Sequence, residues 1–136
     1  MYQRDYILKM IEMLGQFVVS ILKRISKKEF KEAEDLLEES YFTLLKESAA
    51  KFTFIPKEKL TDQLLSDYNF QEGHLEILAQ LFKVEADLRF AQGNSELSSE
   101  FYQKALIIFE FFDNNSKDFS IQRKKDTDEI KEKINK

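Results

Sequence analysis

The sequence predicts an all-α protein built from antiparallel helical hairpins, with about five to six helices in a single domain that spans residues 1–136. Only three Gly and one Pro occur in the 136 residues, so helix breakers are rare. Apolar residues recur at helical spacing along most of the chain, and they supply a 43% hydrophobic content that is sufficient for one core. A Gly-Asn pair at residues 93–94 separates two such apolar patterns, as expected for a tight turn between two helices.

The first helix is predicted over residues 3–25. Its apolar positions advance in steps of four and three residues, which is typical of a helix packed along a seam: Ile7, Ile11, Leu14, Val18, Ile21 and Ile25. Gly15 lies in the middle of this helix. Two interpretations remain open for it, a close helix crossing or a tolerated surface glycine.

A second helix is expected to begin after Ser26, because Ser26 and Glu29 have the spacing of a capping box. This helix is expected to fade near Ala50. The only proline, Pro56, suits the first turn of a short third helix over residues 57–65.

The clearest predicted loop covers residues 66–73. Two aromatic residues in it, Tyr68 and Phe70, are expected to fold back onto the core, since aromatic side chains seldom stay fully hydrated.

A helical hairpin is predicted around Gly93. The fourth helix covers about residues 74–92, Gly93 provides the left-handed cap, and Asn94 or Ser95 begins the fifth helix. A polar helix over 118–134 is expected to close the chain, held by four apolar residues: Phe119, Ile121, Ile130 and Ile134.

The hairpin at residues 79–112 resembles a tetratricopeptide repeat. The matching positions are Phe82, Ala86, Gly93, Asn94, Ser98, Tyr102 and Ala105. Glu85 and Arg89 depart from the pattern, because the repeat prefers Leu and an aromatic residue there, and no Pro closes it. A fainter copy covers residues 17–40. Since about three repeats make a self-sufficient array, the terminal helices are expected to act as caps.

The chain as a whole resembles a small bacterial family of tetratricopeptide-like proteins that open with M-Y-x-R-D-Y-I-L-x-M-I-E, here Met1–Glu12. The resemblance implies a helical-hairpin fold. The resemblance implies no particular activity, because none is assigned to the family.

Composition narrows the classes of function. The absence of Cys excludes a disulfide framework, and we expect neither a signal peptide nor a transmembrane helix, which together predict a cytoplasmic protein. The net charge is −4; residues 117–136 hold seven basic and five acidic residues, a balance of +2, so the remaining body carries −6. An acidic body argues against nucleic-acid binding, although basic residues cluster at residues 23–31 and 123–125.

No chemical motif is found. His74 lies between Glu72 and Glu76, but it lacks further ligands at metal-binding spacing, so a structural role is expected and no metal site or cofactor is predicted. No nucleophile elbow or glycine-rich phosphate loop occurs, so a non-enzymatic protein is predicted.

The chain contains 13 Phe, and this surplus is the main sequence evidence for a partner surface or a homodimer. We expect a protein or peptide partner to contact exposed sides of five residues: Phe82, Arg89, Phe101, Phe111 and Phe112. The alternative is a small-molecule or peptide sensor with a pocket between helices, suggested by Arg89, Glu85 and Tyr102.

The first helix has a mixed rather than basic polar face, so we expect it to pack within the protein or against a second copy rather than on a membrane.

Overall fold

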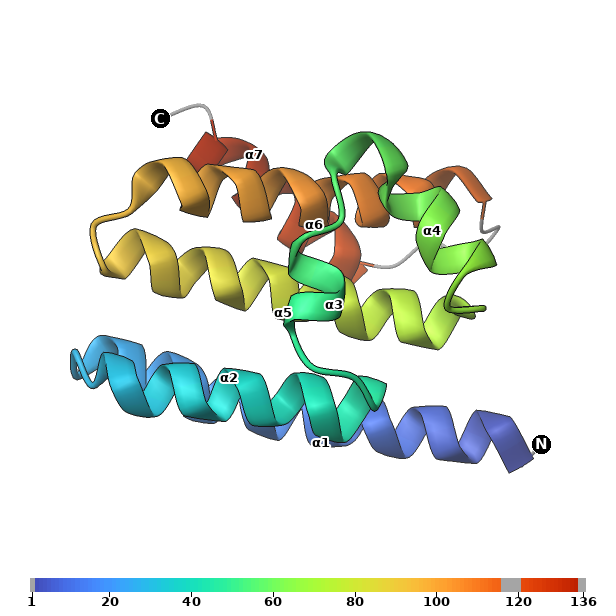
Figure 1. Cartoon of the computed structure of the whole chain (residues 1–136), viewed down its shortest axis with the longest axis horizontal. Coiled ribbons are helices and arrows are strands. Elements are labelled where there is room, and N and C mark those ends of the chain that lie inside the picture. The colour runs from blue at the N-terminus through green and yellow to red at the C-terminus, as the bar shows by residue number, and fades with distance from the viewer. Residues whose placement is uncertain (1, 116–120, 135–136) are drawn as a thin grey trace.

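Two antiparallel helix pairs, α1 with α2 and α5 with α6, form the main layers of the fold (Figure 1). The computed structural model describes residues 2–115 and 121–134. In these residues the elements are α1 (Tyr2–Ser26), α2 (Phe30–Leu45), α3 (Ala50–Thr53), the 3₁₀ turn η1 (Lys57–Lys59), α4 (Leu60–Ser66), α5 (Glu72–Ala91), α6 (Ser95–Asn115) and α7 (Ile121–Ile134). The predicted all-α class is confirmed, with seven α-helices in the described residues rather than five to six.

The additional helices lie in the connection between the two pairs. The sequence predicted one helix over residues 57–65, but this connection contains α3, η1 and α4. Pro56, in extended conformation, precedes η1 as expected for a helix start. Figure 1 shows this connection crossing α5 and α6 on the side nearest the viewer, with α3 in front of α5.

Helix α1 follows the predicted apolar seam. Leu14 and Ile21 are buried, and the other seam residues are half-buried. Gly15 is exposed, and apart from the local backbone of α1 no described atom lies within 4 Å of a Cβ atom added to it. Gly15 is therefore not a crossing point between helices in the described part of the chain.

The close crossing lies instead at Gly73, in the first turn of α5. A Cβ atom added there would lie 2.3 Å from Cγ2 of Ile7 on α1. The sequence predicts a loop over residues 66–73, but Gly73 belongs to α5 and allows α1 and α5 to approach each other.

The junction of α1 and α2 differs from the predicted capping box. Ser26 is the last residue of α1, and its hydroxyl donates to the carbonyl of Lys23 at 2.8 Å. The chain then turns through Lys28, whose φ is 60°, and Glu29 precedes α2. The Glu29 carboxylate forms an ion pair with Arg24 at 3.1 Å rather than a helix cap. Thus the Ser26 hydroxyl hydrogen-bonds a carbonyl at the end of α1 instead of an N–H at the start of α2.

Helix α2 ends at Leu45, five residues earlier than expected. Lys46 adopts a left-handed conformation with φ 64°, and its N–H donates to the carbonyl of Phe42. This cap turns the chain toward the short helix α3.

A cluster of aromatic rings anchors the connection. Phe52 of α3 is fully buried, and its ring centroid lies 5.2 Å from that of Tyr68 and 5.6 Å from that of Phe70. The prediction that Tyr68 and Phe70 fold back onto the core is confirmed.

The α5–α6 turn has the predicted cap. Gly93 has φ +87°, and its N–H donates to Phe90 O while the N–H of Asn94 donates to Arg89 O, which is the Schellman arrangement. Asn94 then caps α6 through its side chain, at 3.1 Å from the N–H of Leu97.

The small residues of the α5–α6 pair make the close contact that the repeat resemblance implied. The hydroxyl of Ser98 donates to the carbonyl of Ala86 at 2.8 Å, and both residues are buried. A larger residue at either position would separate the two helices.

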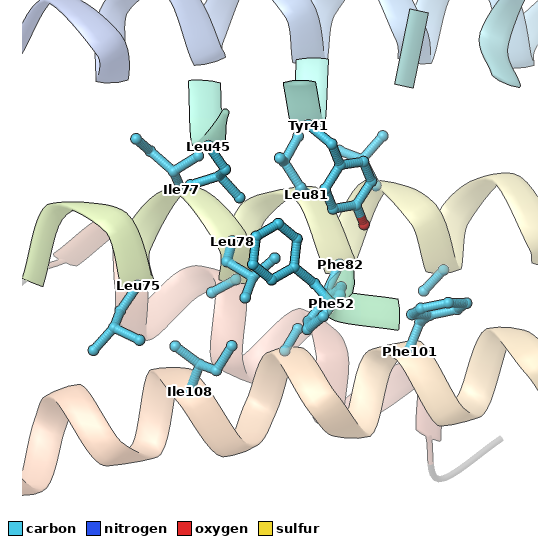
Figure 2. Packing of buried hydrophobic residues seen from close by; sticks show 14 of the residues in the cluster. Tyr41, Leu45, Phe52, Leu75, Ile77, Leu78, Leu81, Phe82, Phe101 and Ile108 are labelled. Atoms are coloured by element: carbon cyan, nitrogen blue, oxygen red, sulfur yellow. The ribbon is translucent and has the colours of Figure 1, made fainter. Parts of the chain in front are cut away.

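Helix α5 is the centre of the core and contacts α1, α2 and α6. In Figure 2, Ile77 and Leu81 point toward Tyr41 and Leu45 of α2, whereas Leu75 points toward α6. Because neighbours cover several sides of α5, its apolar residues are not restricted to one face: the buried ones are Leu75, Ile77, Leu78, Ala79, Leu81, Phe82, Val84, Ala86 and Leu88.

Helix α7 packs on α6. Ile130 is fully buried and Ile134 half-buried, as predicted, but Ile121 is 66% exposed and does not hold the helix. Phe119 lies outside the described residues. Across residues 2–115 and 121–134, no helix combines the length and the apolar character needed to cross a membrane.

Candidate functional site

Three of the five residues predicted to form a partner surface belong to the core. Phe82, Phe101 and Phe112 are 0%, 6% and 5% exposed, respectively. The expectation that they present exposed sides is therefore wrong for Phe82 and Phe112, and only a small part of Phe101 is accessible. The apolar surplus of α6 is buried because α5 and α7 both pack on this helix.

The other two predicted residues are half-buried. Phe111 packs against the edge of the core. Arg89 lies at a groove, where Phe101 also contributes the small part of its surface that remains accessible. Only Arg89 and Phe101 of the five thus come together at a possible binding site.

The groove lies between α2, residues 49–56, α5 and α6, and it has a volume of about 670 Å³. Pockets of this size fit a small organic molecule or a few residues of a peptide. The side chains of Leu37, Tyr41, Ile55, Pro56, Leu97 and Phe101 supply much of its apolar lining. The groove also has a charged part, formed by residues that are far apart in the sequence.

A network of hydrogen-bonded side chains joins α2 and α5 at the groove. The buried carboxylate of Glu85 accepts from the Tyr41 hydroxyl at 3.2 Å and from Nη2 of Arg89 at 2.7 Å. Arg89 also donates from Nη1 to Oε2 of Glu34 at 3.0 Å. Arg89 therefore bridges carboxylates on two helices, and a guanidinium is suited to this because its donors are fixed in one plane.

Burial governs the protonation of the network. Burial raises the pKa of Glu85, and the nearby Arg89 limits that rise. Burial and the neighbouring Glu85 carboxylate raise the pKa of Tyr41 well above its ordinary value. The pKa of Arg89 is also raised: burial opposes the charged form, but Glu85 and Glu34 stabilise it more. Tyr41 thus remains a hydrogen-bond donor, and Arg89 remains a cation.

The opposite wall contains a buried lysine. Lys104 of α6 is 3% exposed, and its ammonium donates to the carbonyl of Thr53 at 2.8 Å. The same ammonium lies 5.6 Å from the centre of the Phe101 ring, a cation–π arrangement. Burial lowers the pKa of Lys104, which the nearby Glu100 opposes. This contact fixes residues 49–56 as one wall of the groove.

The rim carries exposed groups that are available to a partner. Glu38 of α2 and Glu100 of α6 are exposed on opposite sides, and neither forms an ion pair within the described part of the chain. Glu38 accepts a single N–H, that of Ala49, at 3.3 Å. Phe54 lies at the edge and is 83% exposed, the most exposed of the large apolar residues in the described ranges.

Tyr102 lies apart from the groove. Its hydroxyl donates to Asp87, and Lys133 of α7 contacts both residues at 3.2 Å. Burial and Asp87 raise the pKa of Tyr102. The set suggested for a pocket, Arg89, Glu85 and Tyr102, is therefore divided: the first two line the groove, and Tyr102 attaches α7 to the hairpin.

His74 has the structural role that the sequence predicted. Its Nδ1 accepts from the N–H of Gln71 at 3.2 Å, and its ring stacks on Phe70 at 5.1 Å. Burial lowers the pKa of His74, in agreement with a neutral acceptor. No three His, Asp or Glu residues in the described ranges lie together as a metal would require.

Most of the groove, including Glu34, Tyr41, Thr53 and Lys104, was not predicted from the sequence. The groove residues that the sequence did suggest are Glu85 and Arg89. They are spaced i, i+4 within an apolar helical pattern, where buried charged side chains need partners. Comparison of the chain with protein-family models, curated proteins and solved structures finds no match.

Proposed function

We propose that the protein is a non-enzymatic interaction module that binds a short peptide segment of a partner protein in the groove between α2, residues 49–56, α5 and α6. The observation that carries this proposal is the combination of an apolar floor, an ordered Arg89 network and an exposed Phe54 at one open groove. The buried charged side chains already form hydrogen bonds within the protein. We therefore interpret them as groups that hold the groove walls in place, and not as catalytic groups.

The rim charge indicates the chemistry of the segment. Glu38 and Glu100 present carboxylates from two walls, whereas the basic groups Arg89 and Lys104 already hold acceptors of the protein. A segment that combines Lys or Arg with one or two apolar side chains complements this arrangement. Phe54 offers an aromatic surface for an apolar or cationic side chain.

Peptide selection tests this proposal. Displayed random peptides should enrich sequences with basic and apolar residues, and binding of a selected peptide should fall at least tenfold in Glu100→Lys. The matched control is Glu110→Lys, an exposed position on the same helix that does not line the groove. Absence of enrichment, or equal binding by both variants and by Phe54→Ser, would disprove the assignment.

The second candidate function is a small-molecule sensor that uses the same groove. Its volume of about 670 Å³ supports this alternative, since it lies in the range of ligand pockets. A thermal-shift screen distinguishes the two, because a ligand at 100 times its Kd adds about 2.7 kcal/mol of stability. A shift with a metabolite and no peptide enrichment would favour the sensor.

We also infer a cytoplasmic protein of the bacterial tetratricopeptide-like type. The absence of Cys supports the compartment. The order of the helices supports the type, because α5 packs on both helices of the preceding pair, as successive repeats of a solenoid do.

A further inference from the structure

Helix α1 carries a second apolar stripe, on the side that faces away from the core. Leu8, Val19 and Leu22 are 55%, 67% and 41% exposed. At about 100° per residue, these three side chains fall within about 60° of one another around the helix. Half-buried Ile11 borders the same side. We call Leu8, Ile11, Gly15, Val19 and Leu22 the outer stripe.

Gly15 lies at the centre of the outer stripe. It is seven residues from Leu8 and seven from Leu22, and it is exposed. Apart from the local backbone of α1, no atom of the described chain lies within 4 Å of the position of a Cβ. Glycine in the middle of a helix is unfavourable. At the centre of an apolar stripe it permits another helix to approach closely.

We propose that the outer stripe binds the α1 helix of a second copy of this chain, in an antiparallel pair that crosses at Gly15. A two-fold axis through Gly15 places Leu8 of one copy level with Leu22 of the other, and Ile11 level with Val19. The stripe is therefore complementary to itself, as an interface between two identical chains requires.

The charges beside the stripe favour this direction. Exposed Asp5 and Glu12 lie on one edge of it in the first half of α1, and exposed Lys23 lies on the same edge in the second half. In the antiparallel pair, this edge of one stripe lies beside the same edge of the other stripe. Asp5 of one copy then lies within about 3 Å of Lys23 of the other along the helix axis. A parallel pair places identical residues level with one another and provides no such ion pair.

Sedimentation velocity of the full chain tests the dimer. We expect the wild-type protein to sediment as a dimer at high micromolar concentration, and Val19→Glu to sediment as a monomer with unchanged helical circular dichroism. The control Phe90→Ser removes an equally exposed apolar residue of α5 and should leave the dimer intact. A wild-type monomer at every concentration, or equal loss in both variants, would overturn the proposal.

Charge exchange tests the antiparallel direction. Asp5→Lys and Lys23→Asp should each weaken dimerisation several-fold, and the double variant should restore it. Failure of the double variant to restore dimerisation would refute the proposed pairing.

Disulfide cross-linking provides a second test of direction, because the chain contains no native Cys. Leu8→Cys and Leu22→Cys proteins should cross-link when mixed and oxidised. Leu8→Cys alone should not, since two copies of position 8 lie about 21 Å apart along the antiparallel axis. Efficient cross-linking of Leu8→Cys with itself would contradict this geometry.

Discussion

The hydroxyl of Tyr41 on α2 donates a 3.2 Å hydrogen bond to the buried carboxylate of Glu85 on α5. These residues are 44 positions apart, and each is buried. The bond joins the two helix pairs at the floor of the groove. It also supplies a donor to a carboxylate that is largely shielded from water.

The first prediction concerns this bond. Tyr41→Phe keeps the buried ring but removes the donor to Glu85, so we expect the free energy of unfolding to fall by about 1–2 kcal/mol. Urea denaturation measures the change. Tyr68→Phe, which removes a more exposed bond to the carbonyl of Lys51, is the control and should cost less. Equal losses of unfolding free energy in the two variants would show that the bond to Glu85 stabilises the fold no more than the exposed bond of Tyr68.

The second prediction concerns the approach of α1 to α5. In an open helix, Gly→Ala stabilises by about 0.5–1 kcal/mol, but Gly73→Ala directs a methyl group at Ile7 and should destabilise by about 1–3 kcal/mol. Adding Ile7→Ala removes the obstructing atoms. The double variant should therefore lose less stability than the two single changes added together, as measured by a denaturant double-mutant cycle. A stabilised Gly73→Ala protein would contradict the close crossing.

The third prediction separates core from surface phenylalanines. Phe82→Ala should cost about 3–5 kcal/mol, because the ring is fully buried in α5. Phe90→Ala, on the same helix but 65% exposed, should change stability by no more than about 0.5 kcal/mol. Thermal unfolding of both variants measures the difference. Similar melting temperatures would show that Phe82 is not a core residue.

The fourth prediction is a pH dependence of stability. In Glu76 of α5, the buried carboxylate oxygen Oε2 has no hydrogen-bond partner among the described residues. Burial raises the pKa of Glu76 above the ordinary 4.5, although Arg123 and a hydrogen bond with Gln80 oppose the rise. Because its pKa is higher in the folded state, the folded protein binds the proton more tightly. The contribution of Glu76 to stability is therefore complete below pH 4.5 and is lost as the pH rises through the folded pKa.

Glu76→Gln tests this dependence. The variant should be more stable than wild type by about 1 kcal/mol at neutral pH, and the difference should shrink toward pH 4. Exposed Glu132→Gln on α7 is the matched control and should show no such trend. If the difference in stability between Glu76→Gln and wild type did not change with pH, the titration of Glu76 would not be its cause.

Local chemistry made the helix pairs predictable. The spacing of Leu14 and Ile21 predicts the inner face of α1, and Gly93 with Asn94 predicts the turn between α5 and α6. Each of these features depends on residues within a turn or two of one another. Where two local solutions compete, as for the Ser26 hydroxyl, the sequence did not show which helix end it would satisfy.

What the sequence by itself determined is therefore the helical class, the α5–α6 hairpin and the structural role of His74. Only the tertiary structure decided which phenylalanines are buried, that Gly73 rather than Gly15 lies at a crossing, and that Arg89 meets Glu34 across 55 residues. The physical reason is that helix formation depends on neighbours along the chain, whereas burial and the pairing of buried charges depend on which helices pack together.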